Sequence, residues 1–431
     1  MTRGRLLMIV NFFPPAGGGG VYRPLSFVKH LSRLGWEITV VAPRPGEFWI
    51  SDPGLEREVP PSVRVVRTAS LSGLRVLRAL GGGRGRSGSR RSSSGFGALR
   101  RLGEFFLLPD TYAGWAPFAA REAGRLASSE RFDAVYSTSP PDSSHLAAMR
   151  LARRRRIPWV ADFRDPWVNL RLRTPPTPVH RFLHERMERA AARADLVLVT
   201  TEAHEETMRR SYPECRVERI PNGYEEEDFQ GEPGAVPPPE PFTVTHCGML
   251  TLGRSVRPFL EGFAAFAKRA PAKAAATRVA FVGARESANE ELAGSLALAD
   301  RVRFEDNLPH REVVRRERES HVLLLVKHDD ERYRGLVPGK LYEYIGARRP
   351  ILAIAPEGEA ARIVASMRRG EVASIGDPAD VAAKLELLHD RWRAGTLESG
   401  YDLREAPERS RRAAAERLDA LLTALVKGSC R

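Results

Sequence analysis

Short apolar runs alternate with longer amphipathic stretches along the whole chain. The runs are rich in Val, Ile and Leu, which is typical of strands buried on both faces of a parallel sheet. They lie at residues 5–10, 36–43, 63–67 and 133–137, within 158–167, 194–210 and 217–229, and then at 242–247, 276–283, within 301–314 and 321–330, and at 351–355 and 371–376. Stretches with a helical period separate them. This order predicts an α/β protein with two doubly wound, Rossmann-like domains.

Residues 231–241 (GEPGAVPPPEP) interrupt the alternation with a Pro- and Gly-rich linker. We therefore place an N-terminal domain at 1–230, a second domain at 242–402 and a final amphipathic helix within 403–431. A second interruption, about 81–98, is basic and low in complexity. It cannot bury a core, so we predict a disordered loop inside the first domain.

Residues 336–355 (LVPGKLYEYIGARRPILAIA) contain the most informative helix of the chain. A helix that opens just after Pro338 and Gly339 offers unpaired N–H groups and a positive dipole end to a phosphate. Lys340 adds a full charge there, and the Glu343 carboxylate, one turn later, suits a pair of hydroxyls such as a ribose diol. The alternative is a solvated helix with an ordinary surface Lys and Glu.

Two further Gly-containing loops precede helices. Residues 11–20 (NFFPPAGGGG) end in a run that includes Gly18, Gly19 and Gly20, which allow close backbone approach to a ligand. The loop is neither G-x-G-x-x-G nor a Walker loop, and a flexible turn is the alternative. The second loop, within 248–263, contains Arg254. Both loops predict phosphate-approach sites.

A polar cluster follows the strand in PWVADFRDPW, residues 158–167. Asp162, Arg164 and Asp165 emerge there at the carboxyl edge of a predicted parallel sheet, where ligands bind in open α/β folds. We therefore treat the three as candidate site residues. A buried structural ion pair is the alternative.

The net charge of +14 comes largely from one region, because residues 59–103 contain ten arginines and no acidic residue. Such an excess suits nucleic acid, an anionic membrane or an anionic substrate. The absence of zinc-knuckle, recognition-helix and RNA-binding patterns argues against nucleic acid. Phe105, Phe106, Leu107 and Leu108 adjoin this region; we expect them to pack in the core, with contact to a membrane surface as the alternative.

Three scattered cysteines and the lack of an apolar run of about 20 residues predict a cytoplasmic protein, with possible peripheral association at the inner membrane face. The cysteines form no metal-ligand pattern.

The segments PGKLYEYIGARRPILA, VADFRDPW and IPNG together resemble retaining glycosyltransferases of family 4, which have the GT-B fold, in a subgroup with a DFRDPW motif. The resemblance implies that both domains face a cleft and that the final helix crosses back to the first domain. It implies donor binding by residues from several loops, with Glu343 on the ribose and Leu308 at the base pocket: Gly18, Gly19, Gly20, Arg254, Leu308, Gly339, Lys340, Leu341 and Glu343.

The same resemblance assigns Asp162 and Arg164 to the acceptor or the transferred sugar, and gives Asp165 and Ser139 positioning roles in catalysis. The sequence departs from the family pattern at three places. Gly335 stands where many members have the first Glu of a Glu-x7-Glu pair, Met249 stands where Arg is common, and Arg164 replaces a His.

The function implied is transfer of a hexose-like sugar from a nucleotide-sugar donor to an acceptor hydroxyl, with retention of anomeric configuration. We expect no cofactor and no metal, because the chain lacks the Asp-x-Asp metal anchor. The acceptor is a lipid-linked sugar, a polysaccharide precursor or a small molecule, as in cell-surface polysaccharide or glycolipid synthesis. Two alternatives remain: a GT-B sugar-nucleotide epimerase, and a catalytically degenerate scaffold that binds a membrane or a partner.

Overall fold

The computed structural model describes residues 3–45, 51–71, 105–230, 236–250 and 254–429. The chain forms two compact units. The first comprises Met1–Pro221 with Arg412–Arg431, and the second comprises Asn222–Arg411. The predicted disordered loop at 81–98 lies outside the described residues.

The first unit is built on a seven-stranded parallel sheet in the order β3-β2-β1-β4-β5-β6-β7. Its strands are β1 (Gly4–Ile9), β2 (Trp36–Pro43), β3 (Arg64–Thr68), β4 (Ala134–Ser139), β5 (Trp159–Phe163), β6 (Leu196–Val199) and β7 (Val217–Arg219). Its helices are α1 (Gly19–Arg33), α4 (Ala116–Ser129), α5 (Ser143–Arg155), α6 (Pro178–Ala191), α7 (Glu202–Ser211) and α16 (Arg411–Ser429), with short helical turns η1 (Pro53–Glu58), η2 (Ala113–Trp115) and η3 (Val168–Leu172).

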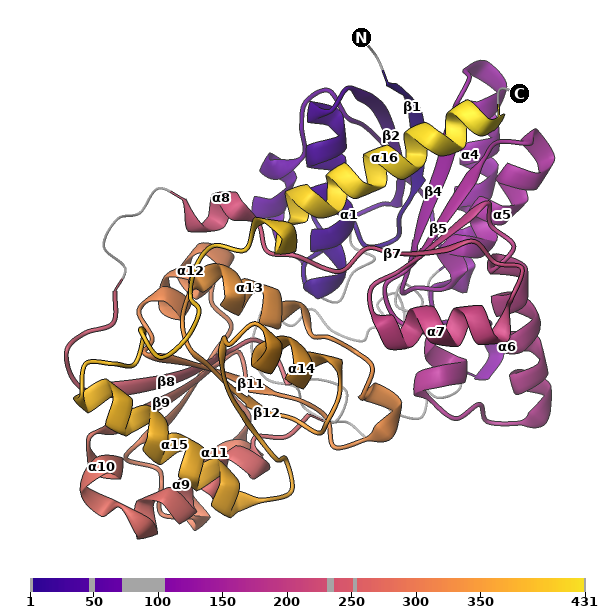
Figure 1. Cartoon of the computed structure of the whole chain (residues 1–431). Coiled ribbons are helices and arrows are strands. Elements are labelled where there is room, and N and C mark those ends of the chain that lie inside the picture. The colour runs from indigo at the N-terminus through magenta and orange to yellow at the C-terminus, as the bar shows by residue number, and fades with distance from the viewer. Residues whose placement is uncertain (1–2, 46–50, 72–104, 231–235, 251–253, 430–431) are drawn as a thin grey trace. The chain divides into compact units, whose positions relative to one another are not determined.

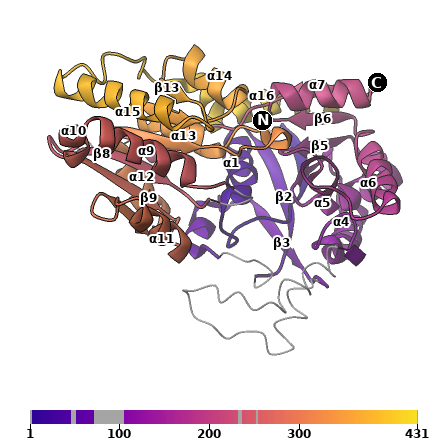
Figure 2. The same ribbon diagram turned by 90° about the horizontal axis from the view of Figure 1, so that it is seen from below.

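Helices cover both faces of this sheet because successive strand residues point to opposite sides. Leu6 and Met8 of β1 pack with apolar residues of α1 and α16. Leu7 and Ile9 of the same strand pack with residues of α4 and α5 on the other face. Figure 1 shows α1 and α16 together on one side of the first unit, and Figure 2 shows α4, α5 and α6 on the other.

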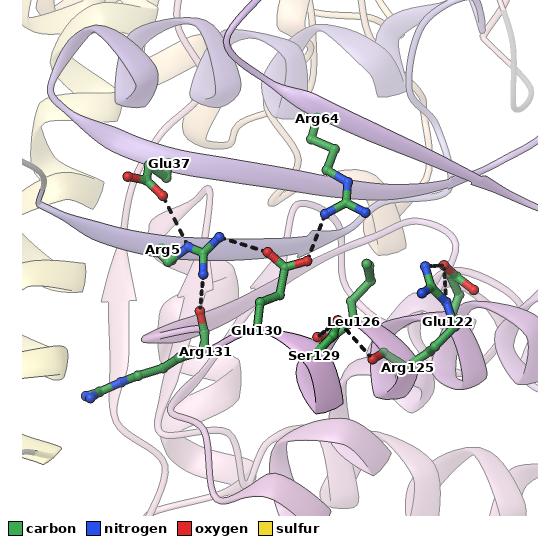
Figure 3. A network of polar contacts seen from close by, with 9 residues as sticks. All are labelled: Arg5, Glu37, Arg64, Glu122, Arg125, Leu126, Ser129, Glu130 and Arg131. Atoms are coloured by element: carbon green, nitrogen blue, oxygen red, sulfur yellow. Dashed lines mark hydrogen bonds and ion pairs between the residues drawn. The ribbon is translucent and has the colours of Figure 1, made fainter.

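Charged side chains at the amino ends of these strands bind one another (Figure 3). Glu130 accepts hydrogen bonds from Arg5 at the start of β1 and from Arg64 at the start of β3, each at 2.8 Å. Arg5 also pairs with Glu37 at 3.1 Å. This network neutralises charge at the edge of the sheet opposite to the one where ligands bind in such folds.

The second unit contains a six-stranded parallel sheet in the order β10-β9-β8-β11-β12-β13. Its strands are β8 (Phe242–Cys247), β9 (Thr277–Val282), β10 (Val302–Glu305), β11 (Val322–Val326), β12 (Ile351–Ile354) and β13 (Gly370–Ala373). Its helices are α8 (Glu226–Phe229), α9 (Arg257–Arg269), α10 (Pro271–Ala275), α11 (Ser287–Ser295), α12 (His310–Arg318), α13 (Gly339–Ala347), α14 (Glu359–Ser366) and α15 (Pro378–Arg393), with turns η4 (Glu331–Tyr333) and η5 (Pro407–Arg409). One core lies under α9 and α15, and another under α13 and α14.

Both units are thus doubly wound α/β folds with parallel sheets, which confirms the predicted fold class. One expectation about packing is wrong. Phe105 is 40% exposed and Phe106 is 70% exposed, so these two residues do not enter the core. Their segment lies instead on the surface beside α6, where the Phe105 and His180 rings are 4.5 Å apart. Among the described residues, no helix is long and apolar enough to cross a membrane.

Candidate functional site

The carboxyl edge of the second sheet brings two strand ends together at the point where strand order reverses. β8 leads to β9 on one side and its other neighbour, β11, leads to β12 on the opposite side, so the connections leave these two strand ends in opposite directions, which is where such folds have a crevice. Gly248 follows β8 with a φ of 123°, a conformation that favours glycine. A Cβ at Gly248 would lie 3.1 Å from Cε of Lys340, so the strand end directly contacts the start of α13.

The N-terminus of α13 is open to a ligand. Pro338 is its N-cap and no side chain caps the helix. A Cβ placed on Gly339 would meet no atom of the described residues within 4 Å. The first N–H groups of a helix have no acceptor inside it and carry the positive end of its dipole. The second unit therefore contains the helix start after Pro338 that the sequence predicts.

Lys340 and Glu343 form a short ion pair on the first turn of α13, with 2.6 Å between Nζ and Oε2. Arg411 approaches the other oxygen of Glu343 at 3.7 Å. Burial opposes the charge of Glu343, but Lys340 and then Arg411 outweigh it and lower the pKa of the carboxyl. Glu343 is therefore an ionised carboxylate, which is the form that can accept two hydrogen bonds from a diol.

A second carboxylate, which the sequence analysis missed, lies behind this pair. Glu317 near the end of α12 has no exposed surface. Its Oε1 is 3.6 Å from Nζ of Lys340, longer than a hydrogen bond, and neither of its oxygens has a hydrogen-bond partner in the described part of the chain. Burial raises the pKa of Glu317 to about 8, although Lys340 counteracts the shift. Its sequence context, RRERES, looks like a solvated helix end and gave no signal.

The remaining predicted donor residues of this unit fall into two groups. Arg254 is half-buried and donates to the Met249 carbonyl at 3.1 Å. Burial, together with the charges of Arg254 and Lys340, lowers the pKa of His246 to about 4, so both cations lie close to the end of β8. Leu308 and Leu341 instead pack in the core beneath α13, and the N–H of Leu341 donates to the Pro338 carbonyl.

In the first unit, the predicted glycine loop leads from β1 into α1. Gly18 has a φ of 89° and is the N-cap of α1, and a Cβ on Gly19 would meet nothing within 4 Å in the described part of the chain. A Cβ on Gly20 would come within 2.9 Å of the Phe12 ring, so only glycine fits without a shift. The loop thus has the open helix start that the sequence predicts.

Arg164 holds three segments of the first unit together. Its Nε donates to the Ser139 carbonyl at 2.8 Å, and its terminal nitrogens donate to the carbonyls of Pro140 and Gly20. The guanidinium thereby fixes the glycine loop against the end of β4. Planar guanidinium groups with several fixed donors suit such a clamp.

Asp162 has no exposed surface and forms the buried ion pair that the sequence analysis left as the alternative. It accepts two hydrogen bonds from Arg23 of α1, at 2.9 and 3.0 Å, and another from the Thr138 hydroxyl at 3.2 Å. Burial opposes its charge, but Arg23 outweighs this and lowers the pKa of Asp162.

The two predicted positioning residues differ in access. Asp165 is half-buried beside Arg164, whereas Ser139 is fully buried and its hydroxyl has no partner among the described residues. Sequence reasoning also missed a pair of buried acids here. Burial raises the pKa of both Asp110 and Asp142, and the repulsion between them adds to the shift at Asp142.

Comparisons with known proteins agree with this architecture. Residues 17–223 match the family model described as a glycosyl transferase 4-like domain. No curated protein sequence matches the chain. Among solved structures, sucrose-phosphate synthase from Thermosynechococcus elongatus has a TM-score of 0.68 and 16% identity, with 99% of this chain and 100% of that chain covered. Anabaena HepE, in complex with UDP and glucose, has a TM-score of 0.66 and 14% identity, with 98% and 100% covered.

A third structure, the lipopolysaccharide-biosynthesis glycosyltransferase WaaG, has a TM-score of 0.57 and 14% identity, with 98% of each chain covered. Likeness at these identities defines the fold, which is GT-B. Within that fold, residues 17–223 are similar in sequence to the glycosyl transferase 4-like domain.

Proposed function

We propose that the protein is a retaining glycosyltransferase that moves a sugar from a nucleotide-sugar donor to an acceptor hydroxyl. The observation that carries this proposal is the start of α13, where an open helix N-terminus, Lys340 and the ionised Glu343 lie within one turn. The match of residues 17–223 to a glycosyltransferase domain and the UDP bound in the similar HepE structure support it.

The donor would bind with its diphosphate at the N-terminus of α13 and its ribose hydroxyls on Glu343. Lys340 donates to one oxygen of Glu343. The diol would replace this hydrogen bond, and the ammonium would then turn to the diphosphate. Arg254 is the second cation near the same strand end. The two charges and the helix N-terminus stabilise the leaving diphosphate without a metal.

In the reaction, the bond between the anomeric carbon and the donor phosphate oxygen breaks while the acceptor oxygen bonds to the same face of that carbon. The acceptor proton passes to the leaving phosphate oxygen, which gains the electron pair of the broken bond. No protein nucleophile is required. Asp165, half-buried beside Arg164, would help to position the acceptor.

The donor assignment predicts a selective thermal shift. The purified protein is heated with UDP, GDP, ADP or dTDP, each with and without magnesium. A ligand at 100 times its Kd should stabilise the fold by about 2.7 kcal/mol. We expect one base to give the largest shift, equally with and without magnesium. A folded sample that responds to none of the four would rule out the donor site.

On the acceptor side, we propose an anionic or lipid-linked acceptor reached from the cytoplasmic face of the membrane. Four of the exposed large apolar side chains of the first unit lie on α6 or in the segment beside it: Phe105, Phe106, Val179 and Phe182. His180 connects Phe105 to α6, because its tilted ring lies 4.5 Å from the Phe105 ring and its Nε2 is hydrogen-bonded to the Phe105 carbonyl at 2.8 Å. Ten arginines without an acidic residue precede this patch in the sequence. Apolar anchors beside basic residues suit an anionic bilayer.

This surface predicts binding to anionic vesicles. The double variant Phe106→Ser/Phe182→Ser should bind vesicles of three parts phosphatidylcholine to one part phosphatidylglycerol at least about tenfold more weakly than wild type, because each buried Phe contributes roughly 1.5–3 kcal/mol. Leu387→Ser, at an exposed apolar residue of the second unit, is the control. Equal sedimentation of all three proteins with the vesicles would remove the membrane proposal and leave the donor site untouched.

A product assay separates the proposed transferase from the two alternatives. An epimerase would convert the nucleotide sugar without any acceptor. A scaffold would bind vesicles or a partner and release no nucleotide from the donor. Release of nucleoside diphosphate that depends on an added acceptor supports the transferase.

A further inference from the structure

We propose that Glu317 is a positioning residue of the donor site, which shares Lys340 with Glu343 in the free protein and takes up a proton when a nucleoside diphosphate draws Lys340 away. The inference rests on the proposed function of α13 and goes beyond it, because it assigns a role to a carboxylate outside the motif. It makes nucleotide affinity dependent on pH above neutrality.

The geometry explains why Glu317 depends on Lys340. The Glu317 side chain is fully enclosed, and the ammonium at 3.6 Å is the cation paired with it among the described residues. A buried carboxylate without hydrogen-bond donors is costly to ionise. Lys340 is already bonded to Glu343 at 2.6 Å, so it neutralises one of the two carboxylates better than the other. Glu343 also has Arg411 at 3.7 Å, so Glu317 is the less well compensated of the two carboxylates and the harder one to ionise.

A diphosphate at the N-terminus of α13 would compete directly for the same ammonium. When Lys340 turns toward the phosphates, Glu317 loses its counter-charge and a negative ligand comes near. Its protonated form is then strongly favoured. Below pH about 8 the carboxyl already holds its proton in the free protein, so binding changes little there. Above that pH, binding must take up a proton, and affinity falls as pH rises.

Among the described residues, the charged groups around Glu317 include one other candidate that could titrate in this pH range. On α13, the charges of Lys340 and Glu343 shift the pKa of Glu317, and the charge of Glu317 raises the pKa of Tyr344. On β8, the charge of Glu317 also acts on the Cys247 thiol, but burial raises the pKa of this thiol beyond the range tested. His310 of α12 also faces it and is hydrogen-bonded to Asp228 of α8 at 2.8 Å.

His310 therefore serves as the control position. Burial opposes its charge, but Asp228 outweighs burial and raises the pKa of His310. The charge of Arg411 acts on both His310 and Glu343. The variant His310→Gln should keep the pH dependence if Glu317 is its source, and should lose it if His310 is.

The test is calorimetric titration of the full-length protein with UDP, and with GDP, ADP and dTDP in turn, at pH 7.5, 8 and 9. Buffers of different ionisation enthalpy report the protons taken up. For wild type we expect uptake of about half a proton at pH 8 and a Kd about five- to tenfold weaker at pH 9 than at pH 7.5, by linkage to one group that titrates near 8. Glu317→Gln mimics the protonated acid, so it should show no uptake and a change in Kd below about twofold.

Equal proton uptake in wild type and Glu317→Gln would overturn the inference and leave the proposed function intact. Failure of all four nucleotides to bind folded wild type would overturn both. Thermal unfolding gives a readout that needs no nucleotide. A raised pKa in the folded state favours folding at low pH and loses that advantage as pH rises from about 4.5 to 8. Glu317→Gln should therefore gain Tm over wild type at pH 9 and match it at pH 5; a lower Tm at both would refute the assignment.

Discussion

Glu343→Gln is expected to weaken nucleotide binding by roughly 100-fold or more and to lower kcat/KM at least as much. Two hydrogen bonds from a diol to a charged acceptor contribute about 1.5–3 kcal/mol each, and the amide retains only one acceptor oxygen. The side chain also fixes Lys340 at 2.6 Å, so its loss disturbs the phosphate contact as well. Isothermal titration with the nucleotide that gives the largest thermal shift measures the first effect, and initial rates measure the second.

The control is Glu261→Gln on α9, whose carboxylate forms an exposed pair with Arg257 at 3.2 Å. Surface pairs of this kind contribute at most about 1 kcal/mol, so binding and turnover should be unchanged. Lys340→Ala should affect turnover and nucleotide binding to different extents. Its charge is needed most as the leaving diphosphate develops, so turnover should fall more than binding. Wild-type turnover in both site variants would refute the assignment.

Local sequence patterns were sufficient to predict most of the strands and helices of the fold. Strand residues such as Leu6, Leu7 and Met8 form one apolar run, and a run of that kind is stable only between two helical layers. Glycines with positive φ mark where strands end and helices begin, as Gly18 and Gly248 do. These signals depend on neighbours within a few residues, so one sequence suffices to interpret them.

Contacts between residues far apart in the sequence could not be predicted from such local patterns. Trp36 at the start of β2 donates to Asp419 of α16 at 2.8 Å, across 383 positions. The exposure of Phe105 and Phe106 was also missed, since four consecutive apolar residues look like core unless the surrounding surface is known. Solvent access is a property of the folded molecule and leaves no periodic signal in a short segment.

For the candidate site too, local relations could be predicted from the sequence and contacts between distant residues could not. Lys340 and Glu343 lie one turn apart on a helix, so their proximity follows from the 3.6-residue period. Glu317 reaches Lys340 from another helix, and its surroundings in sequence are those of a surface. The residues of ADFRDPW were found as a cluster, but their partners were not. Arg23, which binds Asp162, lies 139 positions away.

That partnership predicts the largest effect on stability. Asp162→Asn should lower the free energy of unfolding of the first unit by about 3–5 kcal/mol, because it removes the buried carboxylate that accepts two hydrogen bonds from the Arg23 guanidinium. The Tyr136 hydroxyl and Thr138 also lose a charged acceptor. Denaturant titration followed by tryptophan fluorescence measures the change, and Trp159 and Trp167 in this unit are buried reporters.

Glu122→Gln is the matched control. Its ion pair with Arg125 on α4, drawn in Figure 3, leaves 61% of the Arg125 side chain exposed and should contribute at most about 1 kcal/mol. The double variant Arg23→Leu/Asp162→Leu should recover part of the lost stability, because replacing a buried ion pair by apolar groups is often neutral.

The pH dependence of stability is an independent test of the same ion pair. The pKa of Asp162 is lowered in the folded protein, so its stabilisation is present above about pH 4 and is lost as pH falls further. Asp162→Asn should therefore flatten the acid limb of the stability profile, and an unchanged limb with a loss below about 1 kcal/mol would show that the pair does not hold α1 on the sheet.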